Sequence, residues 1–288
     1  MGKTYNTNDI DRIEKLINIG EQIKRKDKIN YQNIKGTRKA GINFIFSQEE
    51  LSEYTKSANN PIYFIEKYCD IKLYDYQKTI IDHYLKYDFS IFLSSHQVGT
   101  FPIFASLFLH FITFNLNKKI YLCGYKLLQI KELIVKIKFL YCKLPFFMKK
   151  GIVNWNERQV QFEDNSIISI TNAEFKECNI MLANDFSHLS DDYANDLITY
   201  VKKHNIKFII NSRPNGANHF YDLVKNSELP INHPEYNNFN TLRTYWYQVP
   251  KLNADWKKNE IKMIGEEIFL QEYELSFISH NKSYNILY

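Results

Sequence analysis

The sequence predicts an α/β fold with a mostly parallel central sheet, and two observations support this. After Tyr74, short apolar runs alternate with longer segments of helical periodicity, an order typical of parallel strands joined by crossover helices. The 288 residues are 44% hydrophobic, 24% charged and 16% aromatic, a globular composition that excludes disordered and collagen-like chains. This length favours one α/β domain with an appended subdomain.

The N-terminal part, residues 1–48, predicts a polar helical segment that leads into the basic connector KGTRKAG. Ser47 then stands two residues before a pair of glutamates, a pattern that indicates the start of a helix. The run NNP at 59–61 marks a turn before a second amphipathic segment.

Short apolar runs predict the strands of the sheet, and the intervals between them predict helices. The expected strands cover residues 89–94, 119–125, 158–164, 166–171, 179–185 and 207–212. The clearest helices are expected at 102–115, 127–142 and 193–204. A last strand is expected within TLRTYWYQVP, residues 241–250, before two helices that cover 255–274.

The net charge of +5 is concentrated near the N-terminus. Residues 1–40 contain ten Lys and Arg against five Asp and Glu, whereas the rest of the chain is balanced. Such a segment predicts contact with nucleic acid or an acidic partner, although an ordinary solvated helix is at least as good an interpretation.

The four cysteines and the longest apolar stretch indicate in which cellular compartment the protein is expected. Their spacing indicates neither a disulfide framework nor a zinc site, which predicts free thiols in a reducing compartment; the four are Cys69, Cys123, Cys142 and Cys178. No signal peptide is evident, and the apolar stretch 101–114 is too short to cross a hydrocarbon core of about 30 Å. We therefore expect a protein that is neither secreted nor embedded in a membrane.

The segment FSIFLSSHQVGTF has the layout of a phosphate-binding loop. A buried strand runs into a loop containing Gly99, and a helix follows whose N-terminus favours anions. The pattern GxxxxGK[ST] is not satisfied, because Thr100 stands where the lysine is expected. An ordinary strand-to-helix turn is the alternative interpretation.

Seven segments, taken together and in order, resemble the large subunit of tailed-phage terminases, the DNA-packaging motor, over its ATPase domain. They are NPIYFIEKYC, KLYDYQKTII, SSHQVGTF, LPFFMKKGIVNWNERQVQFEDNSII, NIMLANDFSHL, NSRPNGANHFYDL, and YWYQVP with IGEEIFLQEYELSF. The resemblance implies a P-loop NTPase fold of the additional-strand type, with a mostly parallel central sheet and a small helical N-terminal subdomain. It divides the chain into an N-terminal segment at 1–48, an ATPase domain at 49–277 and a short tail at 278–288. The nuclease domain that continues the family's chain is expected to be absent.

The resemblance assigns nucleotide contacts to two segments. Gln77 of KLYDYQ stands where the family's glutamine pairs with an adenine edge, with Tyr76 beside the base; a helix cap is the alternative. The phosphate loop comprises His96, Gln97, Val98, Gly99 and Thr100. Here histidine replaces the family's arginine, threonine replaces its lysine, and Phe101 replaces the hydroxyl that binds magnesium.

The resemblance places the catalytic acids of the family at Asn184 and Asp185. In the family an aspartate holds magnesium and the following glutamate orients the attacking water. Asparagine is a poorer magnesium partner, and aspartate is shorter than glutamate by one methylene. Either residue is at best a weak magnesium ligand, so ATP and Mg²⁺ are implied as cofactors whose binding these departures put in question.

The segment NSRPNGANHFYDL is similar to the family's coupling motif, which links the nucleotide state to domain movement. The residues that correspond are Ser212, Arg213, Pro214, Asn215 and Gly216. Arg213 stands where a small threonine is usual, and it is either a replacement positive charge for phosphates or, the favoured interpretation, a solvated side chain. A local β-turn is the competing explanation for RPNG.

The function expected from the resemblance is that of a terminase ATPase module for viral DNA packaging, weak or inactive in ATP hydrolysis by itself. Its expected partners are double-stranded DNA, a separate nuclease chain, the terminase small subunit and the portal, in the host cytoplasm and transiently at the procapsid. One alternative is a pseudo-ATPase that serves as a DNA-binding or assembly protein. The others are a helicase-like ATPase and a nucleic-acid binder that uses residues 24–39.

Overall fold

The computed structural model describes residues 36–42, 45–171 and 176–278. Eight strands form a mostly parallel sheet in the order β3-β4-β5-β2-β6-β7-β1-β8, which confirms the predicted α/β class. The chain divides into two compact units. The first comprises residues 1–73, 105–117 and 131–168, and the second comprises 74–104, 118–130 and 169–288. The helical segment predicted before residue 36 and the tail after residue 278 lie outside the described residues.

The first unit begins its described helices where the sequence predicts them. Helix α2 (Gln48–Asn59) starts with a reciprocal cap, because Glu50 N donates to Ser47 Oγ and Ser47 N donates to a Glu50 carboxylate oxygen. Helix α3 (Pro61–Tyr68) has Pro61 at its first position, and Asn60 caps it by accepting from Tyr63 N. Both predicted helix starts are therefore confirmed.

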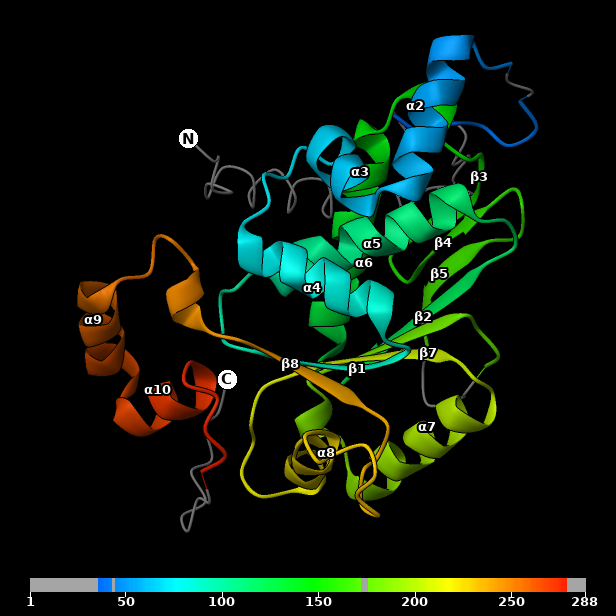
Figure 1. Cartoon of the computed structure of the whole chain (residues 1–288). Coiled ribbons are helices and arrows are strands. Elements are labelled where there is room, and N and C mark those ends of the chain that lie inside the picture. The colour runs from blue at the N-terminus through cyan, green and yellow to red at the C-terminus, as the bar shows by residue number, and fades with distance from the viewer. Residues whose placement is uncertain (1–35, 43–44, 172–175, 279–288) are drawn as a thin grey trace, which may run out of the picture. The chain divides into compact units, whose positions relative to one another are not determined.

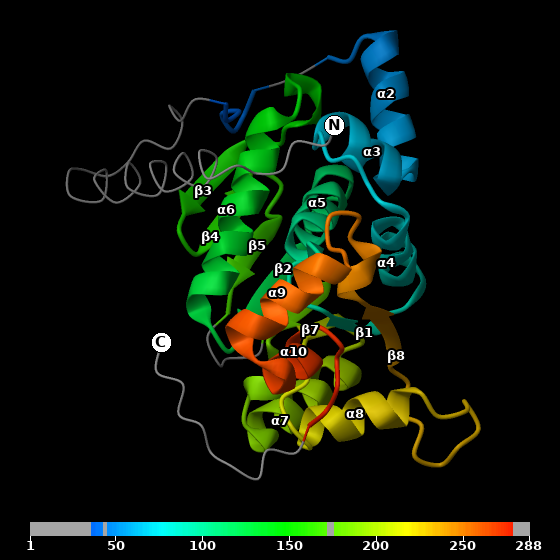
Figure 2. The ribbon, with the colours of Figure 1, turned by 90° about the vertical axis from the view of Figure 1, so that its left-hand side faces the viewer.

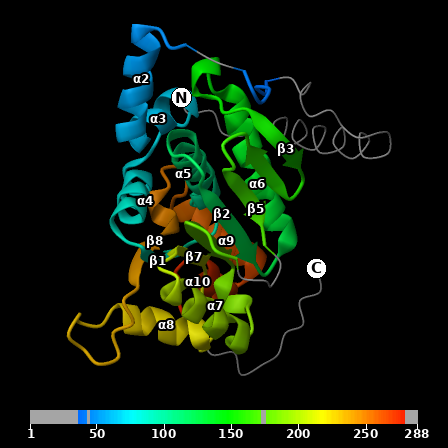
Figure 3. The same ribbon diagram turned by 90° about the vertical axis from the view of Figure 1, so that its right-hand side faces the viewer.

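The rest of the first unit packs a long helix on a hairpin. Helix α6 (Leu127–Lys143) lies beside strands β3 (Ile152–Asn156) and β4 (Gln159–Phe162), which pair antiparallel (Figures 2 and 3). Strand β5 (Ile167–Ile170) follows. The sequence prediction missed β3, because only its first residue is buried and its polar residues leave no apolar run.

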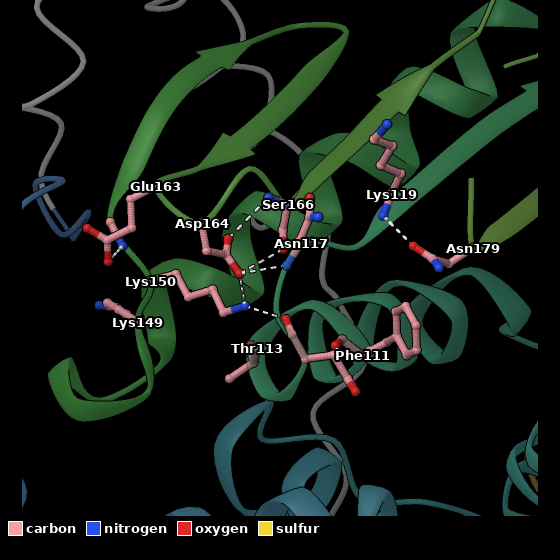
Figure 4. A network of polar contacts seen from close by, with 12 residues as sticks. Phe111, Thr113, Asn117, Lys119, Lys149, Lys150, Glu163, Asp164, Ser166 and Asn179 are labelled. Carbon is pink, nitrogen blue, oxygen red and sulfur yellow. Dashed lines mark hydrogen bonds and ion pairs between the residues drawn. The ribbon is translucent and has the colours of Figure 1, made fainter. Parts of the chain in front are cut away.

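A half-buried ion pair joins elements of the first unit (Figure 4). Lys150 Nζ lies 2.6 Å from Asp164 Oδ2 and donates to Asn115 O at 2.5 Å, at the end of helix α5 (Thr100–Phe114). Asp164 also accepts from the Asn117 amide and from both the amide and the hydroxyl of Ser166. One cation thus meets one carboxylate, with further donors around it.

The second unit contains the parallel part of the sheet. Strands β1 (Phe89–Ser94), β2 (Lys119–Gly124), β6 (Ile180–Asn184) and β7 (Lys207–Ser212) confirm four predicted strands. Strand β8 (Asn240–Thr244) ends earlier than predicted, because residues 246–248 turn into a short 3₁₀ helix whose Trp246 is buried. All strand pairs that these five strands form with one another are parallel.

Helices cover both faces of these strands. Helix α4 (Asp75–Lys86) lies on one side of β1 and β8, and helices α7 (Asp191–Lys203) and α8 (His219–Ser227) lie on the other (Figure 1). The core between the sheet and α7 and α8 includes Phe186, Phe208, Phe220 and Phe239, all fully buried. Helix α8 was not predicted, since its short segment was interpreted only as part of a motif.

A C-terminal element, residues 246–278, has a small core of its own. Helices α9 (Ala254–Ile264) and α10 (Glu266–Glu272) lie side by side (Figure 2) and confirm the two helices predicted there. Trp246, Phe269 and Tyr273 form the core, with Trp256 packed against it. The four cysteines are free thiols. Among the described residues, no helix combines the length and apolar character needed to span a bilayer.

Candidate functional site

The candidate site lies within the second unit, at the carboxyl edge of β1, β6 and β7. Asn184 of β6 is in register with Asn211 of β7, and Leu93 of β1 is in register with Ser212. The segments that follow these strands therefore meet at one edge, the position where parallel α/β sheets bind ligands. This edge brings together the loop, acidic and coupling segments singled out in the sequence.

Loop 95–99 joins β1 to α5 and makes a tight turn. Gln97 and Gly99 both have positive φ, 65° and 76°. Val98 and Thr100 are buried, whereas the side chains of His96 and Gln97 are exposed. A β-carbon at Gly99 would lie 3.4 Å from Gln77 Nε2, so the loop passes close to the amide of Gln77.

Gln77 serves as a helix cap and also lies beside the loop. It is the third residue of α4, and its Oε1 accepts from Tyr74 N at 3.1 Å. Its neighbour Tyr76 donates its hydroxyl to Val98 O at 3.0 Å. Gln77 thus makes the hydrogen bond of a helix cap, although it is buried and not at the surface, and its contact with adenine stays a prediction.

The first two amides of the loop are bonded to the protein itself. Ser95 N donates to Thr244 O at 2.8 Å, and His96 N donates to Glu272 O at 2.9 Å. The Ser95 hydroxyl donates to Tyr273 O, and His96 Nδ1 lies 3.2 Å from the Tyr273 hydroxyl. Loss of hydration, and then the positive charge of Arg213, hold the pKa of His96 below its ordinary value. A histidine with a lowered pKa is a poor substitute for the arginine that the resemblance expects at this position.

The start of α5 also offers little to a phosphate. Its first residues are Thr100, Phe101 and Pro102, so the position of the expected lysine has no charge. Phe101 has no hydroxyl for a metal, and Pro102 has no backbone N–H to donate. The helix N-terminus supplies only the amides of its first two residues and its dipole.

Asn184 is held in a row of three amide side chains. Its Nδ2 donates to Gln129 Oε1 at 2.8 Å, and its Oδ1 accepts from Asn211 Nδ2 at 2.7 Å. Asn184 is only 2% exposed. Gly124 of the neighbouring strand makes this packing possible, because a β-carbon there would lie 2.6 Å from Asn184 O. We call Gln129, Asn184 and Asn211 the amide row.

Asp185 is paired with an arginine from the coupling segment. It adopts a left-handed conformation (φ 51°), is 6% exposed, and its Oδ1 lies 3.6 Å from Arg213 Nη2. Arg213 Nη1 lies 3.0 Å from Glu272 Oε2. The favoured interpretation of Arg213 as a solvated side chain is wrong, because its guanidinium joins two carboxylates and is 22% exposed.

The coupling segment is tied to Ser187, which the sequence prediction missed. The backbone oxygen of Ser187 accepts from Asn215 Nδ2 and Asn218 Nδ2, and Ser212 Oγ bonds both the amide and the hydroxyl of Ser187. Pro214 is buried and Gly216 has a φ of 69°. A role in coupling stays a prediction. The signal for Ser187 was its position two residues after Asp185.

These residues do not fit a magnesium-bound triphosphate. The loop carries no cation, both polar atoms of the Asn184 side chain are occupied within the amide row, and the carboxylate of Asp185 already faces Arg213. In the part of the chain that the structure describes, no group of three or more His, Cys, Asp or Glu is placed to hold a metal ion. We therefore assign no chemistry to a bound nucleotide.

Comparison with known proteins identifies the fold. No family model matches the sequence. The structure resembles a mutant of the large terminase ATPase domain of Thermus phage P74-26, with a TM-score of 0.64 at 13% identity over 75% of this chain and 98% of that one. It also resembles the HK97 bacteriophage large terminase (TM-score 0.58, 14% identity, 76% of this chain and 54% of that one).

A third similar structure is the large terminase of a thermophilic bacteriophage in complex with ADP (TM-score 0.51, 10% identity, 81% of this chain and 54% of that one). The chain thus spans nearly all of an isolated terminase ATPase domain and about half the length of the longer terminases. Its fold resembles that of phage large-terminase ATPase domains.

Proposed function

We propose that this chain is a motor module of a viral DNA-packaging terminase, with ATP hydrolysis that is weak or absent when the chain acts alone. The observation that supports this best is the match to 98% of the P74-26 ATPase domain. The order of the seven sequence segments agrees with it. At 13% identity the match concerns the fold, so the function itself needs direct measurement.

The wider assembly forms part of the same proposal. A separate nuclease chain is one proposed partner of this chain. The other proposed partners are double-stranded DNA, the terminase small subunit and the portal. The proposed location is the host cytoplasm, transiently at the procapsid.

A specific observation favours a second candidate, a pseudo-ATPase that keeps the fold for assembly or DNA contact. The side chains at the catalytic positions bond to the chain itself: Asn184 within the amide row, and Asp185 to Arg213. Phosphoryl transfer depends on positioned cations and a positioned water. Side chains that already bond other residues of the chain are poorly suited to binding a cation or positioning a water.

The first experiment measures thermal melting with and without millimolar Mg-ATP. A ligand at about a hundred times its dissociation constant stabilises a fold by roughly 2.7 kcal/mol, which raises the melting temperature of a chain of this size by a few degrees. The thermophilic bacteriophage terminase was crystallised with ADP, so ADP is the second probe. A shift supports the weak-ATPase version, and no shift supports the pseudo-ATPase version.

A matched variant tests the site directly. Thr100→Lys, Phe101→Thr and Asn184→Asp together restore the family's residues at three positions. If the packaging-motor proposal is right, the variant shows a larger Mg-ATP melting shift than wild type does. Binding of a labelled DNA duplex is measured in parallel, with a deletion of residues 24–39 as control. If neither protein binds duplex DNA or nucleotide, the proposal fails.

A further inference from the structure

The C-terminal element is attached to loop 95–99 mainly through the end of α10. Glu272 contributes its backbone oxygen to His96 N, and Tyr273 contributes its backbone oxygen to the Ser95 hydroxyl. The Tyr273 hydroxyl lies 3.2 Å from His96 Nδ1 and donates to Glu260 Oε1 at 2.9 Å. The contacts between loop and element thus join two residues of the loop, Ser95 and His96, to two residues of the element, Glu272 and Tyr273.

Arg213 adds the charged part of this attachment. Its guanidinium lies between Asp185, at the end of β6, and Glu272, at the end of α10. One cation therefore holds two carboxylates that come from segments about ninety residues apart in the sequence. Removal of the guanidinium would leave two carboxylates facing each other, and like charges at short range repel.

The charge of this neighbourhood argues against a polyphosphate in the same place. Asp185 and Glu272 outnumber Arg213, and Glu260, which is 9% exposed, adds a third carboxylate through Tyr273. A triphosphate would have to displace Glu272 from Arg213 and approach this excess of negative charge.

We propose that Arg213 is a built-in latch, which holds the C-terminal element on loop 95–99 by pairing with Asp185 and Glu272 and needs no nucleotide to do so. The latch supplies from within the chain the positive charge that the loop lacks. This inference deepens the proposed function, since it concerns the same site, but it is tested without nucleotide or DNA.

Hydrogen exchange of the His96 amide reports on the latch, because this amide donates to Glu272 O. In Arg213→Gln, exchange at His96 and across residues 269–276 is expected to rise about tenfold or more, as the element opens more often. Exchange in the core of α7 is expected to stay unchanged. In the wild type, millimolar Mg-ATP is expected to leave the His96 rate unchanged.

Arg243→Gln is the matched control. Arg243 pairs with Glu228 at 2.8 Å within the same unit, and both side chains are more exposed, at 33% and 44%. Its loss is expected to leave the His96 rate at the wild-type value. Glu272→Gln keeps the pair of Arg213 with Asp185, and it should raise the same exchange rates if Arg213→Gln does not fold.

The proposal is overturned if His96 exchange is unchanged in both Arg213→Gln and Glu272→Gln, or rises equally in Arg243→Gln. It is also overturned if Mg-ATP slows His96 exchange severalfold in the wild type. Failure of the packaging-motor proposal appears elsewhere, as missing DNA binding and missing nucleotide response in the restored triple variant. The two outcomes are therefore distinguishable.

Discussion

Two clusters of charge, one in each unit, pair cations with carboxylates in different proportions. In the first unit, Lys150 meets Asp164, and both side chains are little exposed, at 13% and 16% (Figure 4). In the second unit, Arg213 meets both Asp185 and Glu272. The first cluster balances its charges one to one, whereas the second keeps an excess of negative charge.

The difference suggests two roles. We call the Lys150–Asp164 pair the staple, because it stabilises one unit, whereas the latch of Arg213 with Asp185 and Glu272 holds two segments together. Lys150 also donates to the backbone oxygen of Asn115, directly after the end of α5. Its ammonium therefore bonds only groups of the first unit. Arg213 instead spans a strand end and the C-terminal element. A balanced pair should matter mainly for stability, and an unbalanced one mainly for how firmly two segments stay together.

The largest effect is expected from breaking the staple. Lys150→Met leaves the half-buried carboxylate of Asp164 without its cation, and we expect a loss of about 2.5 kcal/mol in the free energy of unfolding. Urea unfolding measures it. The control is Lys143→Met, since Lys143 lies 3.7 Å from Asp70, whose side chain is 86% exposed, and should cost less than about 1 kcal/mol.

The same pair should also appear in an acid titration. Burial alone would raise the pKa of Asp164, but Lys150 and Ser166 outweigh it, so the pKa lies below its ordinary value. The stabilisation is therefore present above the ordinary carboxyl pKa and is lost as the pH falls through the lowered value. Equal losses in Lys150→Met and Lys143→Met would contradict the staple.

A charge introduced beside the latch should have the next largest effect on stability. Asn184→Asp replaces a donor to Gln129 Oε1 with a carboxylate oxygen, so two acceptors face each other in a buried place. We expect a loss of about 2 kcal/mol, measured by thermal melting. Asn205→Asp, at an exposed position, is the control. Millimolar Mg²⁺ should not raise the melting temperature of Asn184→Asp. Recovery of the wild-type melting temperature in magnesium would contradict this explanation.

Ser187→Ala tests the uncharged hydrogen bonds near the latch and should have a smaller effect on stability. The change removes a buried hydroxyl that bonds Ser212 Oγ and His188 Nδ1, while the backbone oxygen of Ser187 keeps Asn215 and Asn218. The expected loss is about 1 kcal/mol by urea unfolding. A loss as large as that of Lys150→Met would show that the serine, and not the charges, dominates this edge.

The smallest effect should come from mild acid, which acts through half-buried histidines. Burial lowers the pKa of His110 in the first unit and of His83 in the second, and each ring bonds a backbone oxygen, of Ser57 and Asn240. The unfolded chain then binds protons that the native chain does not, so stability falls as the pH drops below about 6.5. Melting temperatures between about pH 7.5 and 5.5 should decline less in a His83→Gln, His110→Gln variant.

The sequence predicted β1, β2, β6 and β7 of the second unit well because each is a mostly buried, mostly apolar run with a clear end. Strand β3 was missed because its side chains are mostly half-buried or exposed, and α8 because it is short. The adjacency of the loop, Asn184 and Asp185, and the coupling segment was also predictable, since the carboxyl ends of parallel strands share an edge.

The partners of these residues were not predictable from the sequence. Gln129 reaches Asn184 from the start of α6, and Glu272 reaches Arg213 from the end of α10. Neither residue belongs to a recognisable spacing with its partner, because tertiary packing alone brings them together. The interpretation of Arg213 failed for this reason.

The amide row has a practical consequence for handling the protein. Gln129, Asn184 and Asn211 are joined by neutral hydrogen bonds, which neither titrate between about pH 5 and 9 nor depend on salt. The amide row itself should therefore keep its geometry when salt or pH changes within that range, even where the neighbouring ion pairs of Arg213 weaken.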